Sequence, residues 1–103
     1  MDNTRQINKI INAVCEEYDI TRETLLSGNR VAKVVEARGM AMLLMRELLN
    51  MTLKEIGLSM ERTSATVWEA MGKVRYCLKR NDRRMKETYI NLYNELRNKK
   101  RHE

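Results

Sequence analysis

The chain has 103 residues, of which 43% are hydrophobic and 33% charged, a size and composition that suit one folded domain with a modest core. It contains no proline and only four glycines, which favours an all-α fold. No apolar run approaches the roughly 18 residues that span a bilayer, and no signal peptide opens the chain, so we expect a cytoplasmic protein without a membrane partner. The net charge is +6, and the whole excess of Lys and Arg lies in residues 51–103. This asymmetry suits a polyanionic partner, although a solvated basic surface would give the same pattern.

Two helices are expected in residues 1–28. Apolar residues recur with helical spacing from Ile7 to Tyr18, which predicts an amphipathic helix that starts near Thr4. Thr21 is suited to cap a short second helix, and a Ser-Gly-Asn loop follows it.

Residues 30–50 are expected to form a basic loop and then a long helix. The helix is predicted from about Ala32 to Leu49, with Asn50 as its stop. Its predicted buried side comprises Val34, Val35, Ala41, Met42, Met45, Leu48 and Leu49.

Residues 52–78 have the pattern of a helix-turn-helix. A T-x-x-E capping box predicts a short helix that begins at Leu53, and a second N-cap follows at Thr63. A short capped helix, a tight turn and a second helix are the parts of this motif. The apolar face of the second helix of the motif is predicted to consist of Val67, Met71, Val74 and Leu78.

A further helix is expected over residues 82–98, followed by a basic tail at 99–103.

The first turn of that second helix carries short side chains, as a helix entering the major groove of DNA requires, because bulk there would hold its backbone away from the base edges. Hydroxyl groups can bond to base edges or phosphates, and methyl groups can touch a thymine methyl. The candidate base-contacting residues are Thr63, Ser64, Ala65 and Thr66. Spacing alone leaves open that Thr63 is only a cap and that the other three are exposed helix formers.

Five stretches carry a family resemblance: Val14 to Ser27, Met40 to Leu48, Asn50, Leu53 to Gly57, and Thr66-Val67. Over about residues 6–80 they resemble the C-terminal DNA-binding domain of the bacterial replication initiator DnaA, with R-E-L-x-N…L-x-E-I-G as the most specific part. The resemblance implies a compact cluster of five to six helices, similar to the Trp repressor and containing a helix-turn-helix, with double-stranded DNA as its partner.

The sequence also departs from this family where the family reads bases. Arg62, Thr66 and Val67 match the family's Arg, second Thr and core Val, whereas residues 63–65 replace its Asp, His and Thr. We therefore expect that duplex binding, where it occurs, is not to the family's usual origin sequence.

The basic loop of the family is thinned in this chain, because Ala32 and Glu36 occupy positions that are basic in the family. Ala32 falls about where the family has a minor-groove arginine. The cations expected on DNA phosphates are Arg30, Lys33, Arg38, Lys54, Arg62 and Lys73. Further candidates are Arg75, Lys79, Arg80, Arg83 and Arg84, and for any one of these cations simple exposure to solvent is the alternative.

Two classes of function follow from these patterns. The first is a double-stranded DNA-binding protein that inserts helix 63–78 into the major groove, a stand-alone regulator of transcription or replication without ATPase activity, since the chain has no P-loop. The alternative is a helical protein-interaction module that keeps the fold but not sequence-specific DNA binding, with a homodimer or another protein as partner.

An enzyme is the least expected class, because the lone His102 has no catalytic set around it, and neither a metal nor a cofactor is implied. Cys15 and Cys77 each fall on an apolar stripe and are expected as buried free thiols. Trp68 is expected to pack partly buried rather than to stack on bases.

Overall fold

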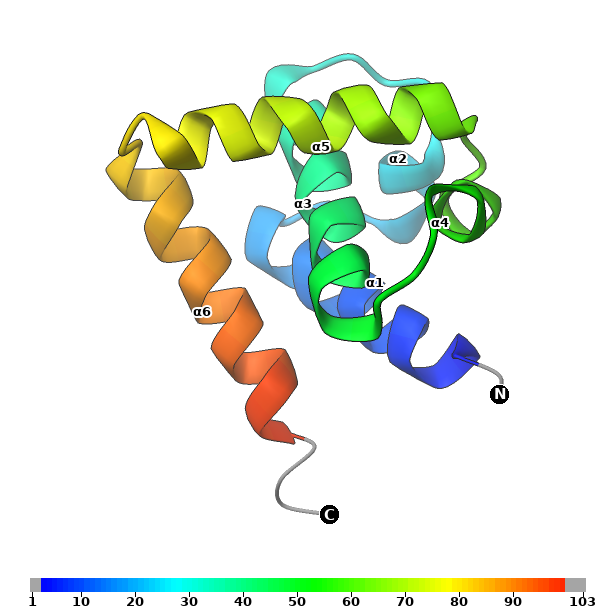
Figure 1. The fold of residues 1–103 in the computed structure, drawn as a ribbon, viewed down its shortest axis with the longest axis horizontal. Coiled ribbons are helices and arrows are strands. Elements are labelled where there is room, and N and C mark those ends of the chain that lie inside the picture. The colour runs from blue at the N-terminus through cyan, green and yellow to red at the C-terminus, as the bar shows by residue number, and fades with distance from the viewer. Residues whose placement is uncertain (1–2, 100–103) are drawn as a thin grey trace.

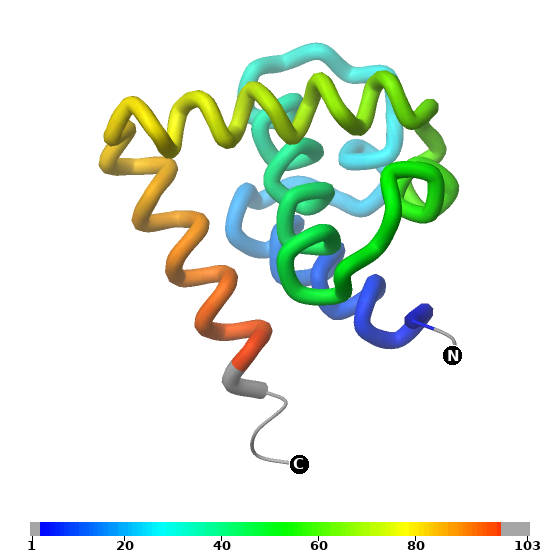
Figure 2. The backbone as a smooth tube through the Cα atoms, viewed as in Figure 1, coloured from blue at the N-terminus to red at the C-terminus, as the bar shows by residue number. Residues whose placement is uncertain are grey.

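The structure is a computed structural model that describes residues 3–99, and within this range it contains six helices and no strand. The all-α prediction is confirmed, and the long helix has the predicted bounds. Of the predicted tail, Lys99 ends the last helix and residues 100–103 lie outside the described range. The helices, shown in Figures 1 and 2, are α1 (Thr4–Tyr18), α2 (Arg22–Leu26), α3 (Ala32–Leu49), α4 (Leu53–Met60), α5 (Ser64–Lys79) and α6 (Arg83–Lys99).

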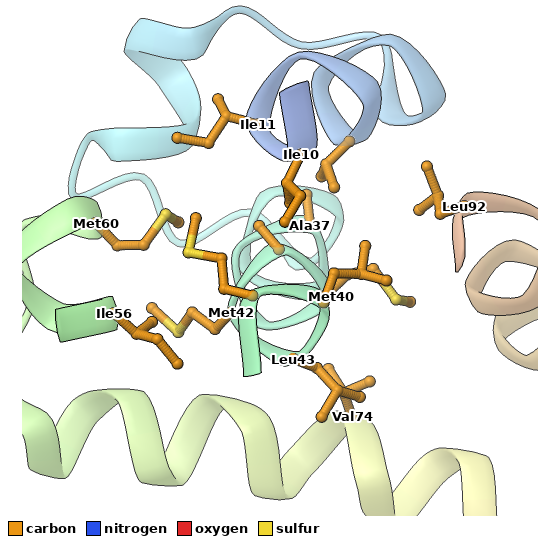
Figure 3. Close-up of a cluster of buried hydrophobic side chains, with 14 of the residues drawn as sticks. Ile10, Ile11, Ala37, Met40, Met42, Leu43, Ile56, Met60, Val74 and Leu92 are labelled. Atoms are coloured by element: carbon orange, nitrogen blue, oxygen red, sulfur yellow. The ribbon is translucent and has the colours of Figure 1, made fainter. Parts of the chain in front are cut away.

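Helix α3 forms the centre of the core. Figure 3 views it nearly end-on, with Ile10 and Ile11 of α1, Ile56 and Met60 of α4, Val74 of α5 and Leu92 of α6 arranged around it. Every residue from Ala37 to Met45 is buried. The predicted one-sided apolar stripe was therefore wrong in extent, because neighbours pack on several sides of α3. The uncharged run from Gly39 to Met45 is typical of a helix buried all round.

Side-chain caps explain where α2, α4 and α5 begin, whereas α1 and α3 begin without one. The Thr21 hydroxyl accepts a hydrogen bond from the backbone N–H of Thr24, and the Thr63 hydroxyl accepts one from Thr66. At the start of α4 the predicted capping box is present: Thr52 accepts from the Glu55 N–H at 3.1 Å, and the Glu55 carboxylate accepts from the Thr52 N–H at 2.9 Å. These bonds satisfy N–H groups that a helix start leaves without partners.

Non-glycine residues with left-handed backbone geometry follow several helices. Asp19, Asn50 and Glu61 occupy this region directly after α1, α3 and α4, with φ between 55° and 60°. Asn81 lies in it between α5 and α6, with φ 64°. The predicted stop at Asn50 is confirmed, and its short amide side chain tolerates this geometry well.

Two glycines permit close approach of backbones. A methyl group on Gly39 of α3 would lie 2.8 Å from the Ala70 carbonyl oxygen of α5. A methyl group on Gly57 would overlap the carbonyl oxygen of Arg62. Gly39 therefore sets the distance between α3 and α5, and Gly57 sets the tightness of the turn after α4.

A polar cluster joins three helices near the start of α3. The Glu36 carboxylate accepts two hydrogen bonds from Arg84 of α6, at 2.7 and 3.0 Å, and one from the Tyr18 hydroxyl of α1 at 2.5 Å. Partial burial alone raises the pKa of Glu36, but the hydrogen bonds from Arg84 and Tyr18 bring the pKa below its ordinary value. Arg84 was a candidate phosphate contact, but its guanidinium group is paired with Glu36.

Both cysteines are free, as expected, but each is half-buried rather than fully buried. Burial raises the pKa of the Cys15 thiol, although the nearby Arg22 opposes this shift. None of the described helices is long and apolar enough to cross a membrane. Within residues 3–99, no group of three or more His, Cys, Asp or Glu side chains is arranged to hold a metal ion.

Candidate nucleic-acid interface

Helices α4 and α5 form the predicted helix-turn-helix. The backbone N–H of Arg62 donates to the Gly57 carbonyl at 2.8 Å and closes the turn, in which Glu61 has left-handed geometry. The buried residues of α5 are Val67, Met71 and Val74, which all belong to the predicted apolar face. The side of α5 that faces solvent is set by this packing.

The four predicted base-contacting residues, 63–66, lie together at the exposed N-terminal end of α5. The Thr63 hydroxyl accepts from the Thr66 N–H at 3.2 Å and donates to the Thr66 hydroxyl at 3.0 Å. Thr63 is thus the N-cap of α5. Ser64 and Ala65 begin the helix with small exposed side chains, so the tip of α5 presents little bulk to a partner.

A groove of about 770 Å³ separates α5 from the loop before α3 and the first turns of that helix. Arg30 lines it from the loop side, and Thr66 and Lys73 line it from α5. In Figure 2 this loop, drawn in cyan, runs behind α5 along the same edge of the molecule. The groove thus joins the basic loop to the helix tip.

Arg38 and Arg62 lie deeper, where they hold the loop. Arg38 is 9% exposed and donates to the carbonyl oxygens of Leu25, Ser27 and Asn29 at 2.7, 2.8 and 3.0 Å. Burial lowers the pKa of Arg38, and the positive charge of Arg62 lowers it further. A phosphate contact was expected here, but the guanidinium is occupied by backbone carbonyls.

Arg62 has a similar role from the turn of the motif. Its guanidinium donates to the carbonyl oxygens of Leu26, Ser27, Met60 and Glu61. Arg62 therefore connects the turn between α4 and α5 to the end of α2, and these hydrogen bonds stabilise the fold.

The remaining predicted cations lie outside the groove. Lys33 is exposed and lines a separate depression with Tyr18 and Arg84. Lys54 is exposed in the first turn of α4. Of the six predicted phosphate contacts, the groove brings together Arg30 and Lys73 as exposed cations.

Trp68 does not pack as expected: its side chain is 61% exposed. It lines a depression of about 370 Å³ on the side of α5 near the start of α4, beside Leu53 and Arg75. Arg75 also contacts Glu47 in an exposed ion pair of 3.5 Å. The exposure of Trp68 could have been predicted from helical spacing, because Trp68 follows Val67 directly and so points away from the apolar face that Val67 and Met71 define.

Comparison with known proteins agrees with the resemblance noted in the sequence. A family model described as the bacterial dnaA protein helix-turn-helix matches residues 7–74. The match contains most of α1, all of α2 to α4 and most of α5, and leaves out α6.

Three curated relatives are each described as chromosomal replication initiator protein DnaA. The Synechococcus protein is 44% identical over 48 residues, which are 47% of this chain and 10% of the relative. The Oleidesulfovibrio alaskensis protein is 32% identical over 66% of this chain and 15% of the relative. The Mycoplasma genitalium protein is 28% identical over 81% of this chain and 19% of the relative. The chain thus spans between 10% and 19% of the length of these relatives.

Proposed function

This chain belongs to the family of bacterial DnaA helix-turn-helix domains, and we propose that it binds double-stranded DNA by placing the tip of α5 in the major groove. The observation that carries the proposal is the joint position of two features on one edge of the molecule. The small, exposed residues 63–66 start α5, and the groove beside them is lined by the exposed cations Arg30 and Lys73.

The proposed contacts follow from this arrangement. Ser64, Ala65 and Thr66 face base edges, and Thr63 adds its methyl group while its hydroxyl caps the helix. Phosphates of one strand contact Arg30 on the loop side and Lys73 on the α5 side of the groove, and these two cations neutralise them. Lys33 and Lys54 contact the flanking backbone, and Arg38 and Arg62 act indirectly by fixing the loop that carries Arg30.

Binding to a random-sequence duplex over a salt series tests the proposal. The logarithm of the affinity is expected to fall linearly with the logarithm of the salt concentration, with a slope of about −0.9 for each neutralised phosphate. Arg30→Gln and Lys73→Gln are each expected to reduce this slope by about one phosphate contact. Lys9→Gln, an exposed cation on α1, is the matched control and should leave the slope unchanged. Weak binding that does not vary with salt would contradict the proposal.

We further propose a role as a regulator of transcription or replication, which the match to the bacterial dnaA helix-turn-helix family supports. Mapping the sites that the protein occupies in its own cells tests this role, with enrichment at promoters or at a replication origin as the expected result. Occupancy spread evenly along the chromosome would contradict it.

Exposed apolar side chains favour a protein-interaction module as the second candidate. Leu58 of α4 and Trp68 of α5 are 75% and 61% exposed. The double variant Arg30→Glu/Lys73→Glu separates the candidates, because charge reversal in the groove abolishes DNA binding and leaves binding through these apolar residues intact. These two positions suit the test better than Arg62, whose guanidinium holds the loop.

A further inference from the structure

We propose that Glu69 of α5 reads a cytosine in the DNA site, an inference that rests on the proposed function. The packing of α5 fixes where this residue points. Spacings of four, three and four residues place Ala65, Glu69, Gly72 and Tyr76 on one ridge. Val67, Met71 and Val74 are buried on the opposite side. When the tip of α5 enters the major groove, this ridge is therefore the part of the helix that lies deepest in it.

The neighbours of Glu69 on this ridge are small. Ala65 lies one turn before it and Gly72 about one turn after it, and a methyl group built on Gly72 would have no atom within 4 Å. In the first two turns of the ridge, the Glu69 side chain is thus the one that reaches furthest from the helix axis. It also lines the groove that contains Arg30 and Lys73.

The Glu69 carboxylate is exposed and takes part in no ion pair. Within residues 3–99 the Glu69 carboxylate is not paired with Lys73, although Lys73 lies four residues after it, at the spacing that permits a helical pair. A carboxylate in this position would be repelled by phosphates, so it favours duplex binding only where a base edge donates a hydrogen bond to it.

The major groove offers such a donor in the exocyclic N4 amino group of cytosine, the usual partner of a glutamate carboxylate there. Adenine also presents an amino group, but its N7 acceptor lies beside that group and repels a carboxylate. Glu69 is therefore expected to select cytosine at one position and to disfavour the other bases there.

Selection of bound sequences from a random duplex pool tests this inference, performed in parallel with the unaltered chain, with Glu69→Gln and with Glu87→Gln. Glu87 is an exposed glutamate of α6, so its variant makes the same charge change away from α5. Thermal unfolding of each variant checks that the fold is kept.

The unaltered chain and Glu87→Gln are expected to return one motif that contains a fixed cytosine. Replacing that cytosine by thymine should weaken binding of the unaltered chain about tenfold or more, and should weaken binding of Glu69→Gln by less than threefold. Glu69→Gln should lose the preference for cytosine at that position and keep the rest of the motif. It should bind non-cognate duplex more tightly, because the negative charge that repels phosphates is gone. If Glu69→Gln returned the same motif as the unaltered chain, or if no motif emerged from duplex that does bind, the Glu69 inference would be wrong while DNA binding stood. If the unaltered chain bound no duplex at all, the proposed function would fail as well.

Discussion

Arg38 and Arg62 donate hydrogen bonds to the same oxygen, the main-chain carbonyl of Ser27. Arg38 approaches it from inside α3, and Arg62 approaches from the turn between α4 and α5. The two positive charges can lie this close because the guanidinium groups also donate hydrogen bonds to five other carbonyl oxygens, whose partial negative charge offsets the repulsion. These carbonyls belong to Leu25, Leu26, Asn29, Met60 and Glu61. The loop before α3 and the turn before α5 are therefore positioned relative to each other by these two guanidinium groups.

Arg38→Leu tests this arrangement. The substitution leaves the carbonyls of Leu25 and Asn29 without the donors they have in the structure, and it is expected to lower the free energy of unfolding by about 2–3 kcal/mol. Urea denaturation measures the change. Arg30→Leu, an exposed cation of the same loop, is the control and should change stability by less than about 0.5 kcal/mol. Equal effects of the two substitutions would show that Arg38 does not hold the loop.

Glu36→Gln is expected to destabilise the protein at neutral pH by about 1 kcal/mol, a modest effect because the Arg84 side chain is 64% exposed. The hydrogen bonds of Arg84 and Tyr18 lower the pKa of Glu36 in the folded state. The ionised carboxylate thus contributes stability above its ordinary pKa of 4.5, and this contribution is lost as the pH falls through the lower folded value.

Unfolding measured across the acid range checks this prediction. The stability difference between the unaltered chain and Glu36→Gln should be constant near neutrality and should shrink as the solution becomes more acidic than pH 4.5. Glu87→Gln, which alters an exposed glutamate of α6, should show no such convergence. A difference that grew on acidification would contradict the assignment.

Gly39→Ala is expected to destabilise the fold by about 1–3 kcal/mol. The added methyl group would lie 2.8 Å from both the Ala70 carbonyl oxygen and a methyl carbon of Val74, so α5 would have to shift on α3. Gly72→Ala is the matched comparison on α5. It meets no atom within 4 Å and is expected to stabilise the protein by roughly 0.5–1 kcal/mol through helix propensity. Thermal unfolding should therefore move in opposite directions for the two variants.

Thr63→Ala removes the N-cap of α5 and is expected to cost about 1 kcal/mol of stability. Thr63→Ser keeps the hydroxyl that accepts from the Thr66 N–H and should recover most of that loss. Chemical denaturation of the three proteins measures the order. If Thr63→Ser were as unstable as Thr63→Ala, the methyl group rather than the hydroxyl would be the stabilising part.

Helix boundaries could be predicted from the sequence because caps are local. The capping box at Thr52 involves residues within a few positions of each other, as does the left-handed stop at Asn50. The resemblance to the DnaA family was also visible, since its most specific pattern spans few residues. Such features need no knowledge of which helices are neighbours.

The roles of individual cations could not be predicted in the same way. Arg84 pairs with Glu36 across 48 positions of the chain, and Arg62 reaches carbonyls 35 and 36 positions away. An arginine at such a place has the same local sequence features as one that faces solvent. The prediction that Trp68 packs partly buried was wrong for a different reason, because the helical period already places Trp68 away from the buried face of α5.

The tip of α5 is nearly independent of the core, since Ser64, Ala65, Thr66 and Glu69 are all exposed while Val67 alone anchors this turn. Substitutions at these four positions should leave folding almost intact. If the tip binds DNA as proposed, these four positions can change without unfolding the domain, whereas Thr63 is constrained because its hydroxyl also caps α5. A library randomised at these positions should contain mostly folded members, so selection of its members for duplex binding would not be dominated by unfolded protein.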